Sequence, residues 1–440
     1  MTTDIQAGSP PDGVLSHEAA EAWIPRACFK PGPAGRIGLE LELILTATPG
    51  HPRVEAPELA GARAELAAAT VRGRVTVEPG GQIELSTVPA DDLPTALGMA
   101  AGDLALLRQI AARHRTALVG IGLDPARRSQ RVLRHPRYEA MEVFFDQHGP
   151  AGRVMMRSTA SVQVNVEAAG AAAGDGRAAG DGRERRWRVL HAAGPALVAA
   201  FANSPLYLAR PTGWRSTRQA VWLALDTYRT REPVIATDES LESAWARWCL
   251  DAPVMLIRRP RGTWSAPPGL TFRQWITDGT RAVPGRPGPT SDDLAYHLTT
   301  LFPPVRARGH LEIRFVDAQP GDWWQAPAGV LAALTDDDRA ADAALDACAG
   351  IRGRWWDAAR AGMRDRELEA AARRVIEVAA AALRRDHHTR SAGEAVEQYA
   401  ERWTFRGRSP ADDVLERRPI PPAPTPADVR SPAAMEGATC

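Results

Sequence analysis

The chain has 440 residues, of which 44% are hydrophobic and 24% are charged. This composition is typical of a globular protein that can bury a sizeable core in roughly one to three domains. Lys30 is the only lysine among the 54 lysine and arginine residues, so the other 53 are arginine. The segment around it, residues 28–32, resembles neither a Walker A loop nor the site of a Schiff-base lysine. Composition therefore disfavours lysine-dependent enzymes, and any phosphate chemistry should depend on metal ions and arginine.

Charge and hydropathy limit the expected partners and location. The formal net charge is +1 and no basic block stands apart from acidic neighbours, so we expect no nucleic-acid and no membrane partner. No apolar run reaches the roughly 18 residues of a membrane span, and residues 1–16 lack a secretory signal pattern, so we expect a cytoplasmic protein. The four cysteines, Cys28, Cys249, Cys348 and Cys440, are far apart and indicate neither a zinc site nor a disulfide framework.

Changes in composition along the chain predict one large domain with a different segment at each end. We expect an N-terminal extension at residues 1–35, a single domain at 36–415, and a disordered tail rich in Pro and Ala at 416–440. The hexapeptide AAGDGR occurs twice at 172–183, which predicts a flexible insert over 170–185. Helical spacing of apolar residues predicts helices at 93–114, 186–203 and 366–385.

Four segments alternate between apolar and polar residues, which predicts strands with one face buried. They lie at residues 36–45, 74–88, 159–166 and 311–317, and the second contains a Pro-Gly-Gly turn. For any single strand, the simpler interpretation is a polar face turned to water. In all four together, however, the polar positions are mostly acids and amides, which favours a shared site.

If these strands pair in one sheet, five carboxylates share one surface. They are Glu40, Glu42, Glu78, Glu84 and Glu312. So many like charges would repel each other strongly unless cations lay among them. Mg²⁺ takes oxygen ligands and is commonly shared between carboxylates and substrate phosphates. The pattern therefore predicts a nucleotide site on a sheet that holds more than one Mg²⁺ and needs no lysine.

The motifs on these strands resemble those of the glutamate-cysteine ligases, in the plant-type/actinobacterial branch that includes the ergothioneine-pathway ligases. In chain order the matching strings are GLELE at 38–42, EPGGQIELS at 78–86, MMRSTASVQVN at 155–165, ANSP at 202–205, Ser216-x-Arg218 with Trp222 and Asp226, HLTTLFP at 297–303 and LEIR at 311–314. A single Glu-x-Glu would be weak evidence. The nine-residue string at 78–86, in order with the others, is specific.

The resemblance implies an α+β fold like that of glutamine synthetase, with a curved, mostly antiparallel sheet forming a funnel and helices packed on its outer face. It also implies that residues 36–415 are a catalytic ligase domain. The implied reaction joins the γ-carboxylate of L-glutamate to the amine of L-cysteine through a γ-glutamyl phosphate. ATP is the co-substrate, two or more Mg²⁺ are the cofactors, and the product is γ-glutamylcysteine for ergothioneine synthesis.

Site residues follow from the resemblance position by position. The implied Mg²⁺ ligands are Glu40, Glu42, Glu78, Glu84 and Glu312, with Gln163 as a weaker, neutral ligand. Arg314 and Glu78 are the implied catalytic residues. The implied ATP-binding residues are Arg314, Glu42 and Glu312. Arg218 is a candidate bidentate clamp for a substrate carboxylate. The expected pocket walls are Arg157, Thr159, Asn165 and Trp222.

Several alternatives remain open on the sequence. Arg218 could instead pair with Asp226, and Trp222 could belong to the core. We interpret His297 as a structural histidine rather than a ligand. The motifs do not identify the acceptor, so a ligase for another amine is a second hypothesis, and a catalytically silent binding or regulatory homologue is a third. The sequence gives no indication of the oligomeric state.

Overall fold

The computed structural model describes residues 13–33, 35–48, 56–168 and 179–417. Its centre is a seven-stranded sheet with the order β2-β3-β1-β5-β9-β8, in which β4 also pairs with β1, and every pairing is antiparallel. These strands are β1 (Ile37–Ala47), β2 (Arg74–Val77), β3 (Ile83–Ser86), β4 (Thr116–Val119), β5 (Ser161–Val166), β8 (Val305–Ala307) and β9 (Leu311–Asp317). A separate hairpin joins β6 (Leu206–Tyr207) to β7 (Arg210–Pro211). The predicted α+β class with a mostly antiparallel sheet is confirmed.

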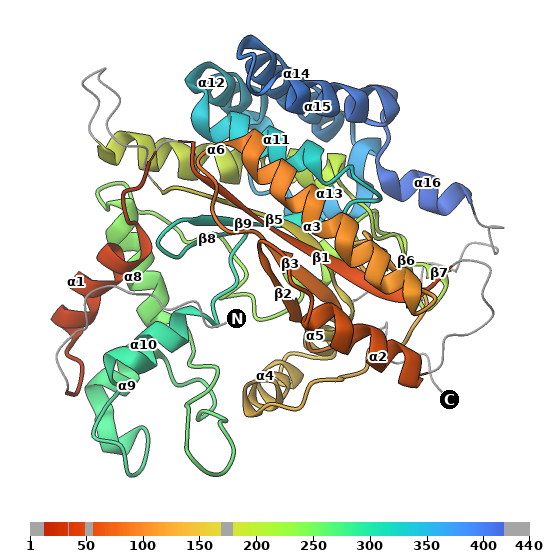
Figure 1. Cartoon of the computed structure of the whole chain (residues 1–440). Helices are drawn as coiled ribbons and strands as arrows, with labels where there is room; N and C mark the ends of the chain where they lie inside the picture. The colour runs from red at the N-terminus through yellow and green to blue at the C-terminus, as the bar shows by residue number, and fades with distance from the viewer. Residues whose placement is uncertain (1–12, 34, 49–55, 169–178, 418–440) are drawn as a thin grey trace.

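The apolar face of the sheet forms the core because alternate residues of each strand point to it. Leu39, Leu41, Val164 and Ile313 are fully or almost fully buried there. Three helices pack directly on this face: α3 (Leu93–Arg113), α6 (Ala179–Ala200) and α11 (Gln325–Asp336). Behind them lie α12 (Asp338–Ala347), α14 (Arg366–Arg385) and α15 (Arg390–Arg402), so the helices above the sheet form two layers (Figure 1).

The polar face of the sheet is covered less completely, by α4 (Pro136–Asp146), α5 (Ala151–Ser158) and α7 (Thr217–Leu223). The remaining helices are α1 (His17–Cys28), α2 (Ala56–Ala67), α8 (Leu241–Asp251), α9 (Phe272–Asp278), α10 (Ser291–Leu298), α13 (Trp355–Ala361) and α16 (Pro410–Glu416). No helix within the described ranges is long and apolar enough to cross a membrane. Because α4, α5 and α7 leave part of the polar face uncovered, this is the face on which side chains can contact a ligand.

The predicted flexible insert at 170–185 overlaps the start of α6, to which residues 179–185 belong. The Arg183 guanidinium donates to Glu242 and lies over the ring of Phe29, which are contacts with distant segments. Residues 169–178 and the predicted tail beyond residue 417 lie outside the described residues. Within the predicted N-terminal extension, α1 packs against α8 and places Trp23 and Ile24 in the main core.

Candidate active site

Strand register brings the predicted acidic residues together on the polar face. Glu42 lies opposite Glu84 across the β1–β3 pair, and Glu40 lies opposite Gln163 across the β1–β5 pair. Glu312 follows on the next strand, since β9 pairs with β5. Because these positions alternate with core residues, their side chains all project from the same side of the sheet. The shared surface that the sequence predicted is present.

Glu78 reaches this surface through a tight turn. The Gly81 amide donates to the Glu78 carbonyl over 2.8 Å, and the Glu78 amide donates to the Gln82 carbonyl over 2.8 Å. Gly81 has φ of +87°, which favours glycine, and a Cβ on Gly80 would come within 1.9 Å of the Arg157 carbonyl oxygen. The two glycines are therefore required for the turn to pack against the end of α5.

A pocket opens over this face of the sheet. Nine of the twelve predicted site residues line it: Glu40, Glu42, Glu78, Glu84, Thr159, Gln163, Trp222, Glu312 and Arg314. Further lining residues are Pro79, Gln82, Arg137, Tyr138, Met141, Met155, Met156, Thr299, Phe302, Arg306 and Arg308. The pocket thus has a charged floor from the sheet and a largely apolar wall from α4, α5 and α7.

Four of the carboxylates form what we call the acidic half of the pocket: Glu40, Glu42, Glu78 and Glu84. Glu42 accepts hydrogen bonds from the Ser161 amide over 2.8 Å and from the Ser161 hydroxyl over 2.9 Å. Glu84 accepts from the hydroxyls of Thr76 and Ser86, each over 3.0 Å. These uncharged donors fix the carboxylates in place but do not neutralise their charge.

The acidic half favours bound protons or cations. Burial, followed by the charges of Glu84 and Glu42, raises the pKa of Glu78 to about 8. Burial, followed by Glu84 and Glu312, raises the pKa of Glu40 well above its ordinary value, and burial followed by Glu84 also raises that of Glu42. At neutral pH the cluster therefore takes up protons or positively charged ligands.

The other end of the floor, which we call the basic half, consists of Glu312 surrounded by Arg306, Arg308 and Arg314. Arg306 lies opposite Glu312 across the β8–β9 pair and donates to its two carboxylate oxygens over 2.8 and 2.9 Å. Arg314 donates to the same carboxylate. Burial alone would raise the pKa of Glu312, but Arg306, Arg314 and Arg308 hold that pKa well below its ordinary value. This carboxylate is ionised and fully compensated.

Gln163 connects the two halves. Its amide nitrogen donates to Glu42 over 2.9 Å, and its amide oxygen accepts from Arg314 over 2.6 Å. In this conformation the oxygen expected to bind a metal is therefore engaged by an arginine. Gln163 therefore makes one hydrogen bond to each half of the pocket floor.

Three predicted site residues lie outside the lining of the pocket. Arg218 is buried beneath Arg314 and donates to its backbone carbonyl over 2.6 Å. Its nearest carboxylate is Asp317, at 3.9 Å, whereas Asp226 pairs with Arg229 over 2.9 Å. The alternative that paired Arg218 with Asp226 is therefore wrong.

The other two residues outside the lining are Arg157 and Asn165. The Arg157 guanidinium pairs with Glu142 over 2.7 Å, so it is held on the helical side of the pocket. The Asn165 amide lies 3.5 Å from Glu40 and supports that carboxylate from the neighbouring strand. Neither residue is therefore part of the pocket wall that the sequence predicted.

Trp222 and His297 resolve two of the open alternatives. Trp222 lines the pocket, packs edge-to-face on Phe302, and has the guanidinium carbons of Arg314 and Arg218 at 5.5 and 5.7 Å from its ring centre. It is therefore a wall residue that also packs against the core. His297 is buried and its Nε2 lies 2.9 Å from the Cys249 carbonyl oxygen, in agreement with a structural role.

Sequence reasoning missed several lining residues, above all Arg306, Arg308 and Arg137. Arg306 and Arg308 alternate around a β8 strand of only three residues, which is too short to show a clear period. Arg137 is the second residue of α4 and donates to the hydroxyl and carbonyl of Thr299 over 3.0 and 3.1 Å. The available signal was the spacing of Arg306 and Arg308 ahead of the LEIR string.

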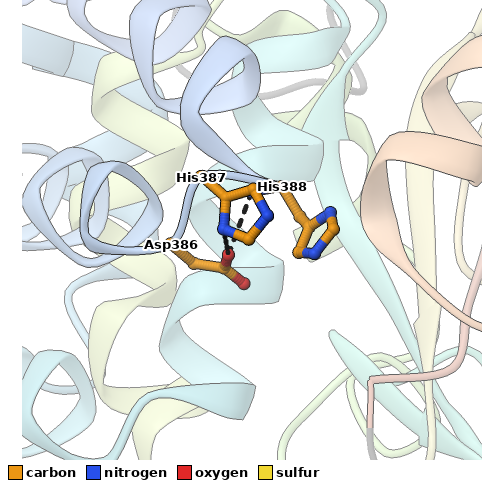
Figure 2. Close-up of side chains that lie close together, drawn as sticks. All are labelled: Asp386, His387 and His388. Carbon is orange, nitrogen blue, oxygen red and sulfur yellow. Dashed lines mark hydrogen bonds and ion pairs between the residues drawn. The ribbon is translucent and has the colours of Figure 1, made fainter.

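A second group of possible metal ligands lies outside the pocket. Among the described residues, Asp386, His387 and His388 form the one group of three whose ligand atoms all lie within 4.8 Å of one another, and Figure 2 shows them at the end of α14. They are exposed, and α14 belongs to the helical layers on the opposite side of the sheet. No three described acids of the pocket approach that closely, so the pocket holds no preformed cage of three carboxylates.

Comparisons with known proteins identify the family of the chain. Residues 36–438 match the family described as glutamate-cysteine ligase family 2. The chain is 41% identical over 408 residues to the glutamate-cysteine ligase EgtA of Mycolicibacterium smegmatis, covering 91% of this chain and 92% of the relative. It is 38% identical over 422 residues to EgtA of Mycobacterium tuberculosis, covering 94% of each chain.

A more distant likeness concerns the fold alone. The crystal structure of a glutamate-cysteine ligase from Francisella tularensis in complex with AMP superimposes with a TM-score of 0.51 at 14% sequence identity. The superposition covers 88% of this chain and 85% of the other. The architecture predicted from the motifs is thus found in a solved ligase.

Proposed function

The chain belongs to glutamate-cysteine ligase family 2, and from this premise we propose that it makes γ-glutamylcysteine from L-glutamate, L-cysteine and ATP. The observation that carries the proposal is the pairing of an acidic half and a basic half on one pocket floor. The reaction brings two anions together, and their charge can be compensated by cations held in the acidic half and by the arginines of the basic half. We further propose that the product supplies ergothioneine synthesis, as the motif resemblance implies.

The acidic half suits Mg²⁺ bound together with a nucleotide. Mg²⁺ has oxygen ligands at about 2.0 to 2.1 Å and is usually held by one or two carboxylates, with phosphate and water completing its shell. Four carboxylates with no cage of three fit that requirement. In this proposal Glu40, Glu42, Glu78 and Glu84 are the ligands. When bound, Mg²⁺ withdraws charge from the phosphate oxygens.

In the basic half, the proposal assigns Arg314 to the transferring phosphoryl group. Its side chain is 13% exposed at the pocket floor, and its Nε has no hydrogen-bond partner. Glu312 holds this guanidinium in place and raises its pKa against the effect of burial, so Arg314 stays charged. A fixed cation of this kind stabilises negative charge that develops in the transition state.

Two steps follow from this arrangement. An oxygen of the glutamate γ-carboxylate attacks the γ-phosphorus of ATP, the bond to the β-phosphate oxygen breaks, and ADP leaves. The amine of cysteine then attacks the γ-carbonyl carbon, phosphate leaves with the transferred oxygen, and the amine loses a proton. The acyl phosphate must be kept from water between these steps. The apolar wall formed by Met141, Met155, Phe302 and Trp222 is suited to exclude it.

The remaining predicted roles are carried forward as part of the proposal. Thr159 lines the pocket and lies next to the wall that would contact the substrates. Glu312 has both oxygens engaged by arginines, so we assign it first to holding Arg314 and only then to a metal. Arg218 does not reach the pocket in this conformation, and its role as a carboxylate clamp stays a prediction.

The direct test is turnover by the purified chain with glutamate, cysteine, ATP and Mg²⁺. We expect γ-glutamylcysteine by mass spectrometry and one ADP for each product. Alanine and 2-aminobutyrate in place of cysteine test the acceptor, and equal rates with them would reject selectivity for cysteine. The Arg247→Ala variant is a matched control, since Arg247 is an exposed arginine on α8 paired with Glu239. Absence of turnover in the wild type would contradict the proposal.

A further inference from the structure

The single lysine of the chain, Lys30, lies close to the basic half of the pocket. The β8–β9 hairpin turns at Gly309, and the Gly309 amide donates to the Cys28 carbonyl over 2.7 Å. This bond joins the hairpin to the end of α1, although the two residues are about 280 positions apart in the sequence. Lys30 follows Cys28 by two positions and is therefore brought to the hairpin turn.

The contact between Lys30 and the turn is close. Gly309 has φ of +82°, and a Cβ built on it would lie 3.6 Å from Cδ and 4.0 Å from Cε of Lys30. The lysine stem thus packs over the glycine, with its ammonium group beyond that contact. Lys30 is half-buried, which leaves part of the side chain accessible to a ligand.

Arg308 lies on the same turn and lines the pocket. Burial lowers the pKa of His310 to about 4, and the positive charges of Arg308, Arg306 and Lys30 act in the same direction. Burial raises the pKa of the Cys28 thiol to about 12, and the same three cations oppose that rise. Two separate groups therefore experience the same cluster of positive charge at this end of the pocket.

Two of the cations at this end share one carboxylate. Arg306 and Arg314 both donate to Glu312, which is the one carboxylate on the pocket-facing positions of the described hairpin. Arg306 also donates to the Leu301 carbonyl over 3.0 Å, which commits its guanidinium further. A polyphosphate carries several negative charges, of which the acidic half with its metal ions can compensate only part. Additional cations at this end would compensate the rest.

We propose that Lys30 and Arg308 form an anion-binding subsite for the polyphosphate of the nucleotide. This inference rests on the proposed ligase function and adds a part of the site that no motif identified. Lysine acts here as a point charge on a flexible stem, which is a common way to bind phosphate without a Walker A loop. A substrate carboxylate would suit the same cations, and the experiments below distinguish the two ligands.

The composition of the chain makes one test unusually specific. An acyl-phosphate derivative of ATP transfers its acyl group to an amine beside the bound phosphates, forming an amide and releasing the nucleotide. Lys30 supplies the only side-chain amine, so acylation is mapped by peptide mass spectrometry against the α-amino group alone. We expect acylation of Lys30 that ATP with Mg²⁺ suppresses and that glutamate or cysteine does not. Absence of this labelling, or suppression by the amino acids alone, would overturn the proposal.

Substitutions provide an independent measurement. Lys30→Met and Arg308→Met should each raise KM for ATP about tenfold with little change in KM for glutamate or cysteine. Lys30→Arg should stay within about twofold of the wild type because it keeps the charge. Arg26→Ala is the matched control, since Arg26 is an exposed cation in the last turn of α1, and it should leave every KM unchanged.

The outcomes separate this inference from the proposed function. A wild type that makes γ-glutamylcysteine while Lys30→Met keeps its KM for ATP would overturn the subsite alone. A rise in KM for glutamate or cysteine in place of ATP would reassign the cations to a carboxylate and overturn the phosphate assignment. If Lys30→Met does not fold, labelling of the wild type still decides the question, because it needs no substitution.

Discussion

The two halves of the pocket floor contain the same residue type, glutamate, in opposite electrostatic states. In the acidic half, neutral hydroxyls and amides hold the carboxylates, and the pKa of Glu78 rises to about 8. In the basic half, Arg306 and Arg314 surround Glu312 and hold its pKa well below the ordinary value. The charge of the side chains that bond to a carboxylate, rather than its residue type or strand position, therefore decides whether that carboxylate is available to a cation.

The largest effect should come from the basic half. Arg314→Gln removes the cation assigned to the transferring phosphoryl group, so we expect kcat to fall about 10³-fold. Added Mg²⁺ should not restore it, because the lost charge is not a metal charge. Steady-state kinetics across Mg²⁺ concentrations measures both effects. Recovery of kcat at high Mg²⁺ would show that a metal ion can replace the charge of Arg314, which would contradict separate roles for the two halves.

Stability should depend on the ion pair in the basic half. Arg306→Met leaves Glu312 buried without its two-point partner, and we expect the free energy of unfolding to fall by about 3 kcal/mol. Replacing both residues with methionine should recover part of this loss, because the pair is removed together while Arg314 loses its bond to Glu312. Urea unfolding measures the change. A loss no larger than that of Arg247→Ala would contradict the account.

In the acidic half the expected loss of kcat is smaller and depends on the Mg²⁺ concentration. Glu78→Gln removes one ligand but keeps the shape, so we expect kcat to fall roughly 10²-fold at low Mg²⁺ and to recover in part at high Mg²⁺. Turnover at several Mg²⁺ concentrations measures this. Identical loss at all concentrations would place Glu78 outside the metal site.

The smallest effect is a dependence of stability on pH without metal. Because the folded pKa of Glu78 is about 8 against an ordinary value of 4.5, the folded chain holds a proton that the unfolded chain releases. Stability should therefore be full below about pH 4.5 with respect to this group and fall as pH rises toward 8. Glu40 and Glu42 act in the same direction.

Mg²⁺ should oppose this fall, so its stabilising effect should be greater at pH 8 than at pH 6. Thermal melting with and without Mg²⁺ at the two pH values is the measurement. Glu78→Gln should flatten the metal-free profile. A metal-free melting temperature that rises between pH 6 and pH 8, with Glu78→Gln showing the same rise, would contradict the assignment.

Several elements of the fold and of the site could be predicted from local sequence patterns. Alternation identified β9 and the helical period identified α14 with the residues that the structure assigns to them, because both are long enough for periodicity to be clear. The turn after Glu78 followed from two glycines that backbone geometry requires. In each case the information lies within a few neighbouring residues.

What could not be predicted depends on contacts between distant segments. The compensation of Glu312 comes partly from Arg306 on a strand of three residues, and Lys30 is brought to the hairpin turn by the bond between the Gly309 amide and the Cys28 carbonyl. The repeated Gly-Asp-Gly sequence predicted a flexible insert, but it did not reveal the contacts that Arg183 of α6 makes with Glu242 and Phe29. Lys30 packs over Gly309, next to the pocket-lining Arg308, and no motif around Lys30 indicated this contact.

The measurement that tests the central claim most directly follows one oxygen atom. With L-glutamate labelled with ¹⁸O in its γ-carboxylate, phosphoryl transfer to that group predicts one labelled oxygen in each phosphate released with γ-glutamylcysteine and ADP. Unlabelled phosphate, or release of AMP and pyrophosphate, would contradict a γ-glutamyl phosphate and with it the roles proposed for both halves of the pocket.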